Sequence, residues 1–166
     1  MKIVKINFYY LIKNNIIFFK KKYFGFLKIP KDISILKNNK FIEIKSFSEE
    51  KKNVNSFYKS LFNILKGLDS PWEIILEISG IGYKVYIKEK FLIFNLGFSK
   101  EKILIIPNYI KTSIIKNKIN LFSIYKDKLG LFANKIILIK KYNPYKKKGI
   151  FFINNFFLKK SNKKKQ

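Results

Sequence analysis

The sequence predicts an α+β protein built from two related units, because one pattern occurs twice along the chain. Residues 29–45 and 106–124 each begin with Ile-Pro and continue as a β-branched stretch. Each then turns at a Lys/Asn cluster and resumes as a second apolar stretch. This order is typical of a β-hairpin. Apolar residues at helical spacing follow each hairpin, so we expect tandem units, each an antiparallel sheet with one packed helix.

The two predicted helices have different start signals. Asn55 or Ser56 can cap the first helix, whose apolar residues fall at three- and four-residue steps up to Leu68. Asp127 is a good N-cap for the second helix. Its apolar residues follow the i, i+3, i+4, i+7, i+8 pattern without a gap: Leu129, Phe132, Ala133, Ile136 and Ile137.

A strand-rich segment separates the two repeats. Residues 72–79 are expected to form a strand and residues 80–82 (GIG) a tight bend. Residues 83–88 and 91–96 then form a predicted hairpin around Glu89. The boundary between the units is expected at residues 67–71 (GLDSP), since Gly ends a helix and Pro resists starting another.

The charge of the chain points to a polyanionic partner. The 166 residues include 36 basic and 10 acidic side chains, a formal net charge of +26, and every basic residue is Lys. Such an excess must meet a polyanion or stay heavily solvated, so nucleic acid or an anionic membrane surface is the expected partner. At 48% hydrophobic and 17% aromatic residues, the chain should nevertheless fold around a packed core.

Residues that the chain lacks disfavour several classes of function. It has no His and no Cys, so disulfides are impossible and the usual zinc and haem ligands are missing. We therefore expect no metal, no cofactor, no small-molecule substrate and, without the commonest general acid–base residue, no enzymatic activity. The longest uncharged stretch, residues 149–158, has ten residues. A bilayer needs about twenty, so membrane insertion is not expected.

Lysine clusters gather after the second predicted helix, and one of them is bounded by rigid residues. In NPYKKKGI, residues 143–150, three lysines lie between Asn-Pro-Tyr and Gly. Such a loop can present Lys side chains and backbone N–H groups to phosphates, although any single cluster fits a solvated surface equally well. Tyr145 can stack on a base or pack in the core, and the sequence leaves both interpretations open.

Several motifs together resemble those of the bacterial-type large-subunit ribosomal protein six family. Residues 80–84 (GIGYK) are similar to the family's Gly-Val-Gly-Tyr-Arg, and residues 96–99 (LGFS) match the family motif intact. Residues 143–150 are similar to Glu-Pro-Tyr-Lys-Gly-Lys-Gly-Ile, in register with Gly130, Ala133 and the Lys140-Lys141 pair. The resemblance covers about residues 28–160. Glu89 replaces the family's hairpin Gly, and Lys147 replaces one Gly of the last motif.

The resemblance implies a structural protein of the large ribosomal subunit, with duplicated α+β domains. It implies binding to large-subunit rRNA near the factor-binding region and the sarcin–ricin loop, beside neighbouring ribosomal proteins. Relative to the family, the first domain has lost about half of its expected length. The expected divisions are a basic, aromatic N-terminal extension (1–27), a truncated first domain (28–70), a second domain (71–155) and a basic C-terminal tail (156–166).

The candidate RNA site combines lysines with glycines. Lysines should neutralise phosphates, and glycines should allow close approach of the backbone. The candidate RNA-binding residues are Lys84, Lys140, Lys141, Tyr145, Lys146, Lys147, Lys148, Gly149, Lys159 and Lys160. Gly80, Gly82 and Gly97 are the candidate positions for backbone approach.

Composition also bears on location and on the rival interpretation. The abundance of Ile, Asn, Lys, Phe and Tyr indicates an AT-rich genome, such as a reduced organellar one. A mitochondrion is preferred to a plastid, since plastid members of the family usually keep a fuller first domain. The rival is a peripheral protein held on an anionic membrane by Lys and aromatic residues. It requires an amphipathic helix with Lys opposite aromatics, which the helix from Asp127 does not offer.

Overall fold

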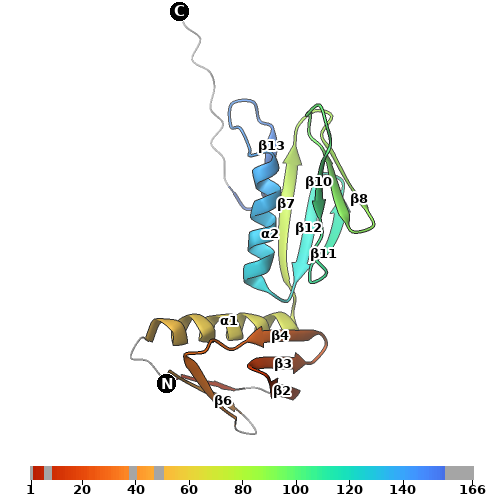
Figure 1. Ribbon diagram of the computed structural model, residues 1–166. Helices are drawn as coiled ribbons and strands as arrows, with labels where there is room; N and C mark the ends of the chain where they lie inside the picture. The colour runs from red at the N-terminus through yellow and green to blue at the C-terminus, as the bar shows by residue number, and fades with distance from the viewer. Residues whose placement is uncertain (1, 6–8, 38–40, 47–50, 156–166) are drawn as a thin grey trace, which may run out of the picture. The chain divides into compact units, whose positions relative to one another are not determined.

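The computed structural model describes residues 2–5, 9–37, 41–46 and 51–155, which form two units (Figure 1). The division between the units lies between Pro71 and Trp72, and the short segment Ile124–Lys126 belongs to the first unit. Each unit contains antiparallel sheets and one helix. The predicted α+β class, with tandem sheet-and-helix units, is therefore confirmed.

Unit 1 contains two three-stranded antiparallel sheets and one helix. The first sheet has the order β1 (Lys2–Lys5), β6 (Phe41–Ser46), β5 (Ile33–Lys37), and the β5–β6 pair is the hairpin expected in residues 29–45. The second sheet is formed by β2 (Tyr9–Lys13), β3 (Ile16–Lys20) and β4 (Phe24–Lys28), in that order. The helix is α1 (Lys51–Asp69).

Helix α1 forms because its apolar side chains fall on one face, which it buries in the core of unit 1. It begins at Lys51, four residues before the expected cap at Asn55. The reason is Val54, which lies three residues before Phe57, is buried with it and continues the apolar face. The helix continues through Gly67, which was expected to end it, and stops at Asp69, shortly before Pro71.

The N-terminal residues differ from the expected extension, because β2, β3 and β4 pack into unit 1. Alternate residues of these strands, among them Tyr10, Ile17 and Phe19, are buried in the same core as α1. A Cβ built on Gly25 would lie 3.5 Å from a Leu68 methyl carbon, so the sheet lies close against the helix. This packing follows from strand geometry, because alternate side chains of a strand lie on the same face of the sheet. The strands before residue 28 therefore add to a first domain that the sequence made look truncated.

Tyr125 completes the core of unit 1 from far along the chain. Its hydroxyl accepts a hydrogen bond from the backbone N–H of Phe26 at 2.9 Å, and the two rings meet edge to face at 5.9 Å. Burial raises the pKa of Tyr125 above its usual value, while the hydrogen bond from Phe26 acts in the opposite direction. The residue is therefore held in its neutral form.

Tyr125→Phe is expected to lower the free energy of unfolding by about 1 kcal/mol, because it removes the acceptor for Phe26. Because burial raises the pKa of Tyr125, the folded state disfavours the phenolate, so the stability of the natural chain falls as pH rises from about 10 through the folded pKa, whereas Phe does not ionise. Urea unfolding followed by circular dichroism should therefore show a difference at about pH 8 that narrows at about pH 11. A difference that stays constant would contradict the assignment.

Unit 2 contains two antiparallel sheets that share one core with a helix. The larger sheet has the order β11 (Lys111–Ile115), β12 (Lys118–Ser123), β7 (Trp72–Ser79), β13 (Gly149–Phe152). The smaller has the order β10 (Lys102–Ile105), β9 (Phe91–Asn95), β8 (Lys84–Lys88). Helix α2 (Lys126–Ile139) runs beside β7 (Figure 1). It buries the expected residues Leu129, Phe132, Ala133 and Ile136.

Most local predictions for unit 2 are confirmed, but Asp127 lies in the first turn of α2 and not at its N-cap, and Ile137 is only half-buried. Two strands were not anticipated. The strand at 72–79, the hairpin around Glu89 and the second hairpin, β11–β12, are all present. Glu89 has a φ of 54°, a left-handed conformation that Gly adopts without cost, which fits its place where the family has Gly. Strands β10 and β13 are short, and β13 pairs with the distant β7, so no pattern of neighbouring residues predicted them.

Candidate nucleic-acid interface

A closed loop connects α2 to β13 and carries most of the predicted RNA-binding residues. The side chain of Asn143 accepts hydrogen bonds from the backbone N–H groups of Tyr145 (2.9 Å) and Lys146 (3.1 Å). The backbone N–H of Asn143 donates to the carbonyl of Lys148 at 2.9 Å. The Ser79 hydroxyl at the end of β7 donates to the carbonyl of Lys147 at 2.8 Å. The loop is thus closed on itself and tied to the larger sheet.

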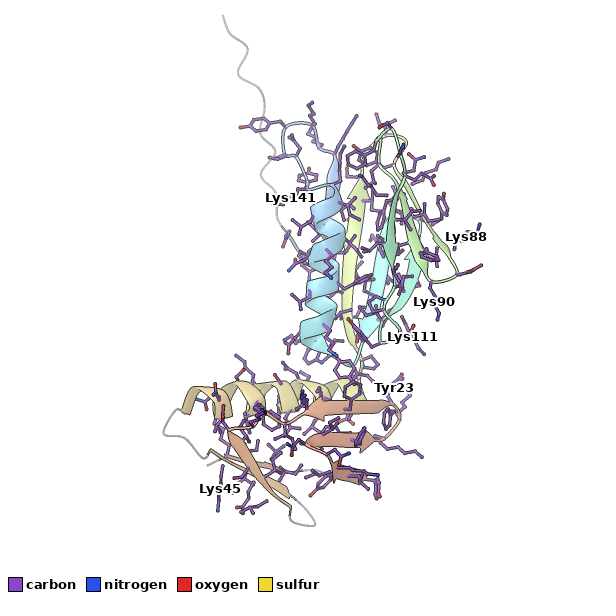
Figure 2. All side chains as sticks on the ribbon, viewed as in Figure 1. Tyr23, Lys45, Lys88, Lys90, Lys111 and Lys141 are labelled. Atoms are coloured by element: carbon purple, nitrogen blue, oxygen red, sulfur yellow. The ribbon has the colours of Figure 1, made fainter. Side chains whose placement is uncertain are left out.

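The side chains of this loop form a basic, solvent-facing surface. Lys141, Lys146, Lys147 and Lys148 are exposed, as is Tyr145, which is therefore not a core residue. Lys141 lies just beyond the C-terminal end of α2 (Figure 2). Residues 140–150 contain no acidic side chain. Anions can therefore approach the loop without repulsion from within it.

Gly149 has a different role from the one expected. It is buried, with a φ of 140°, and a Cβ placed on it would lie 2.6 Å from the carbonyl oxygen of Lys141 and 2.7 Å from the nitrogen of Tyr142. Only a residue without a side chain fits there, because the clash would be with backbone rather than with a flexible side chain. Gly149 therefore allows the two ends of the loop to pack together, and its backbone is not open to an approaching ligand.

Lys147 occupies the position where the family has a Gly. Its φ of 52° lies in the left-handed region, where a residue with a Cβ costs about 1 kcal/mol. The structure thus explains why Gly suits this position. The chain gains one exposed cation there, in exchange for backbone strain.

One of the three other candidate glycines, Gly80, makes room for the ring of Tyr83. A Cβ on Gly80 would lie within 2.6 Å of that ring, whereas one on Gly97 would lie 3.4 Å from it, an ordinary contact distance. Gly80 and Gly97 have positive φ values of 152° and 69°. Gly82 has a φ of 75° and no atom within 4 Å of its built Cβ, so it alone of the three faces open space.

Lys140 differs from the other predicted lysines because it is half-buried against aromatic rings. Its Nζ atom lies 4.1 Å from the centre of the Phe98 ring and 5.8 Å from that of Tyr83. A cation over an aromatic face at this distance is attracted to the ring. Lys140 therefore joins the loop to the bends at residues 80–83 and 96–99. Phe98, and Lys102 with its Nζ 5.7 Å from the same ring, were missed as site residues.

Lys84 lies at the same end of unit 2 as the loop. It is the first residue of β8, directly after the bend at 80–83, and it pairs with Asn95 just before the bend at 96–99. Its side chain is exposed. The structure therefore brings together Lys84, the two bends and the loop. Lys159 and Lys160 lie outside the described residues.

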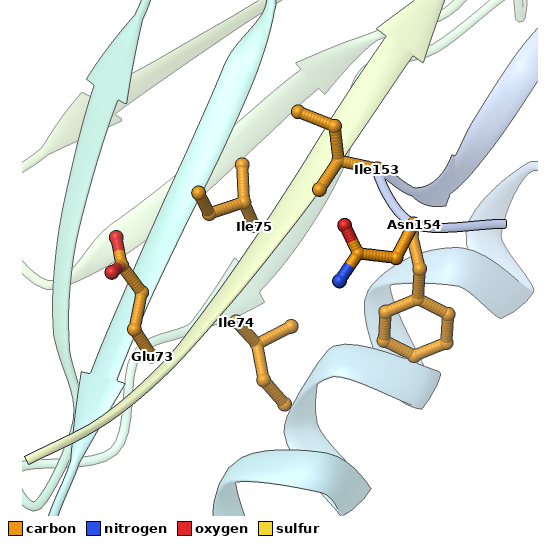
Figure 3. Close-up of a pocket in the computed structure, with 6 residues that line it drawn as sticks. Glu73, Ile74, Ile75, Ile153 and Asn154 are labelled. Carbon is orange, nitrogen blue, oxygen red and sulfur yellow. The ribbon is translucent and has the colours of Figure 1, made fainter.

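A small open pocket elsewhere in unit 2 has the wrong chemistry for an anion. It lies between β7 and the segment after β13, with a volume of about 240 Å³ (Figure 3). The lining consists of apolar side chains, one carboxylate and one amide: Glu73, Ile74, Ile75, Phe152, Ile153 and Asn154. No lysine lines it, so the loop end of unit 2 is the better candidate for binding nucleic acid.

Comparison with known proteins decides the family. No family model matches the chain. It is 35% identical over 147 residues to the large ribosomal subunit protein uL6c of Phaeodactylum tricornutum, covering 84% of this chain and 82% of the relative. The chain belongs to the uL6 family. This is a structural, non-enzymatic class of ribosomal protein, which confirms both the resemblance and the expected lack of enzymatic activity.

Two bacterial relatives show the same extent of similarity. The uL6 protein of Karelsulcia muelleri is 36% identical over 144 residues, covering 82% of this chain and 79% of the relative. The uL6 protein of Borrelia garinii subsp. bavariensis is 34% identical over 131 residues, covering 77% of this chain and 73% of the relative. The relatives are thus of plastid and bacterial type. They support a place in the ribosome and give no support to the mitochondrion in particular.

In the part of the chain that the structure describes, no helix is long and apolar enough to cross a membrane.

Proposed function

We propose that this uL6 protein binds large-subunit rRNA through the loop end of unit 2 and thereby supports translation in an organellar ribosome. The observation that carries the proposal is the closed, acid-free loop with Lys141, Lys146, Lys147 and Lys148 all exposed. Phosphate contacts from such lysines position a protein on RNA and supply most of the affinity. Tyr145, exposed at the same loop, is placed to stack on an unpaired base.

The rRNA segment and the neighbouring proteins follow from family resemblance. We propose contact near the factor-binding region, close to the sarcin–ricin loop, with other ribosomal proteins beside it. Location in a mitochondrion or a plastid remains part of the proposal, since composition favours an organelle and the relatives include plastid-type proteins. A footprint of the bound rRNA would identify the segment directly.

Co-sedimentation separates this proposal from attachment to an anionic membrane. The tagged full-length chain is expected to travel with large ribosomal subunits on a sucrose gradient and to leave that fraction after RNase treatment. The physical reason is that its +26 charge needs the phosphates of the RNA as partner. Flotation with lipid, unaffected by RNase, would contradict the proposal.

A further inference from the structure

The outer face of the β2-β3-β4 sheet in unit 1 is unusually rich in exposed aromatic rings. One side of this meander packs in the core of unit 1, so the other side is left outside it. The strand register places Tyr9, Lys20 and Phe24 in one row across that outer side, and Leu11, Phe18 and Phe26 in the next. Tyr9 is 68% exposed and Phe24 61%. We call this outer side the aromatic face.

Lysines complete the aromatic face in a regular arrangement. Lys20 lies between Tyr9 and Phe24, and a third row carries Lys13 and Lys28 on its two edge strands. Residues 9–28 contain no acidic side chain. Cations therefore lie within one or two sheet spacings of the rings, about 4.8 Å between strands and about 6.7 Å along them.

We propose that the aromatic face binds unpaired, single-stranded RNA by stacking bases on its rings, while its lysines meet the phosphates. Proteins that bind single strands combine a basic surface with aromatic side chains on which successive bases stack. The rings of Phe18 and Phe24 are already stacked, with centroids 6.1 Å apart and an angle of 27° between planes, and a base can extend that stack. The ring of Phe26 is positioned by its edge contact with Tyr125.

The composition of the face favours single-stranded RNA over the other partners. Lysine is depleted at protein–protein interfaces, yet Lys20 lies between Tyr9 and Phe24 in an outer row of this face. Insertion into lipid is disfavoured for the same reason, because Tyr9 and Phe24 cannot enter an apolar layer without carrying that ammonium group with them. Duplex RNA keeps its bases stacked and offers rings no free base face.

This inference rests on the proposed function only for the identity of the RNA as rRNA. The loop at 140–149 also attracts RNA, so each variant of the aromatic face is made twice. One copy is made in the natural sequence, and one in a chain with Lys146, Lys147 and Lys148 replaced by Ala. The contribution of the aromatic face can then be measured even if the loop does not bind RNA, and that of the loop even if the aromatic face does not.

The test measures binding of the full-length chain to a fluorescein-labelled single strand of about nine nucleotides, within the usual site size. Phe24→Ala is expected to weaken binding about tenfold, and Phe24→Leu to weaken it as much, since stacking requires a ring. Phe24→Trp should preserve the affinity. The matched control is Phe62→Ala on α1, which removes another exposed ring away from the face and should change little.

Salt dependence separates the roles of ring and lysine. Phe24→Ala should lower the affinity without changing the slope of log K against log salt, whereas Lys20→Ala should lower the slope by about 0.7. The same oligonucleotide annealed to its complement should show no loss from Phe24→Ala. Full affinity for RNA in Phe24→Leu would overturn the proposal, as would an equal loss of affinity in Phe62→Ala. A Phe24→Ala variant that binds RNA normally but no longer binds anionic vesicles would overturn it as well.

Discussion

Replacing Lys146, Lys147 and Lys148 together with Ala is expected to weaken binding to a large-subunit rRNA fragment by at least about tenfold at physiological salt. Each lysine that neutralises a phosphate releases counterions, so the slope of log K against log salt should fall by about two or more. The closed backbone of the loop depends on Asn143, Ser79 and Gly149, not on the three side chains. The fold should therefore be unaffected.

The matched control removes three exposed lysines from the other end of unit 2. Lys88 and Lys90 flank the β8–β9 turn and Lys111 begins β11, and all three are labelled in Figure 2. Replacing them with Ala removes the same charge but should change the slope by less than one. If both triple variants lower the slope equally, the attraction belongs to the net charge of the chain, and the loop is not the interface.

Gly149→Ala is expected to lower the free energy of unfolding of unit 2 by about 3 kcal/mol or more. The new Cβ would collide with the backbone of Lys141 and Tyr142 at a residue whose φ is 140°. Neither neighbour can rotate away, since the Ile150 N–H donates to the Lys140 carbonyl at 2.8 Å and holds the two segments together. Urea unfolding followed by the fluorescence of Trp72, on β7, measures the effect within the unit concerned.

Gly130→Ala is the natural comparison for Gly149→Ala. Gly130 lies inside α2 with no atom within 4 Å of its built Cβ. Ala is preferred to Gly in a helix by about 0.5–1 kcal/mol, so this variant should be more stable than the natural chain. A similar loss in both variants would show that the tight approach at Gly149 does not determine stability.

The elements that the sequence predicted well are those with a local signal. The hairpins β5–β6, β8–β9 and β11–β12, the strand β7 and the buried face of α2 all follow from spacing within a few residues. The N-terminal strands carried no such signal, because the residues next to the buried Tyr10, Ile17 and Phe19 are mostly aromatic or aliphatic as well. The abundance of lysine and aromatic residues there suggested an extension instead.

The candidate site was predictable in residue type but not in the role of each residue. A sequence motif shows that Gly80 and Gly149 are needed, yet it cannot show that they make room for Tyr83 and for the loop's own backbone. The contact of Lys140 with Phe98 joins residues about forty positions apart and has no local signal. Lys147 was recognised as a replacement of the family's Gly, but only the structure shows the left-handed backbone that explains the Gly.

The segment Ile124–Lys126 has a consequence for the order in which a nascent chain can fold. It belongs to unit 1, where Tyr125 is buried beside β4 and the backbone of Ile124 lies against Gly67. Domains usually fold from the N-terminus as they are synthesised. Here the first unit lacks part of its core until β7 to β12 have all been synthesised. Its last buried ring is therefore added when most of the second unit has already left the ribosome that makes it.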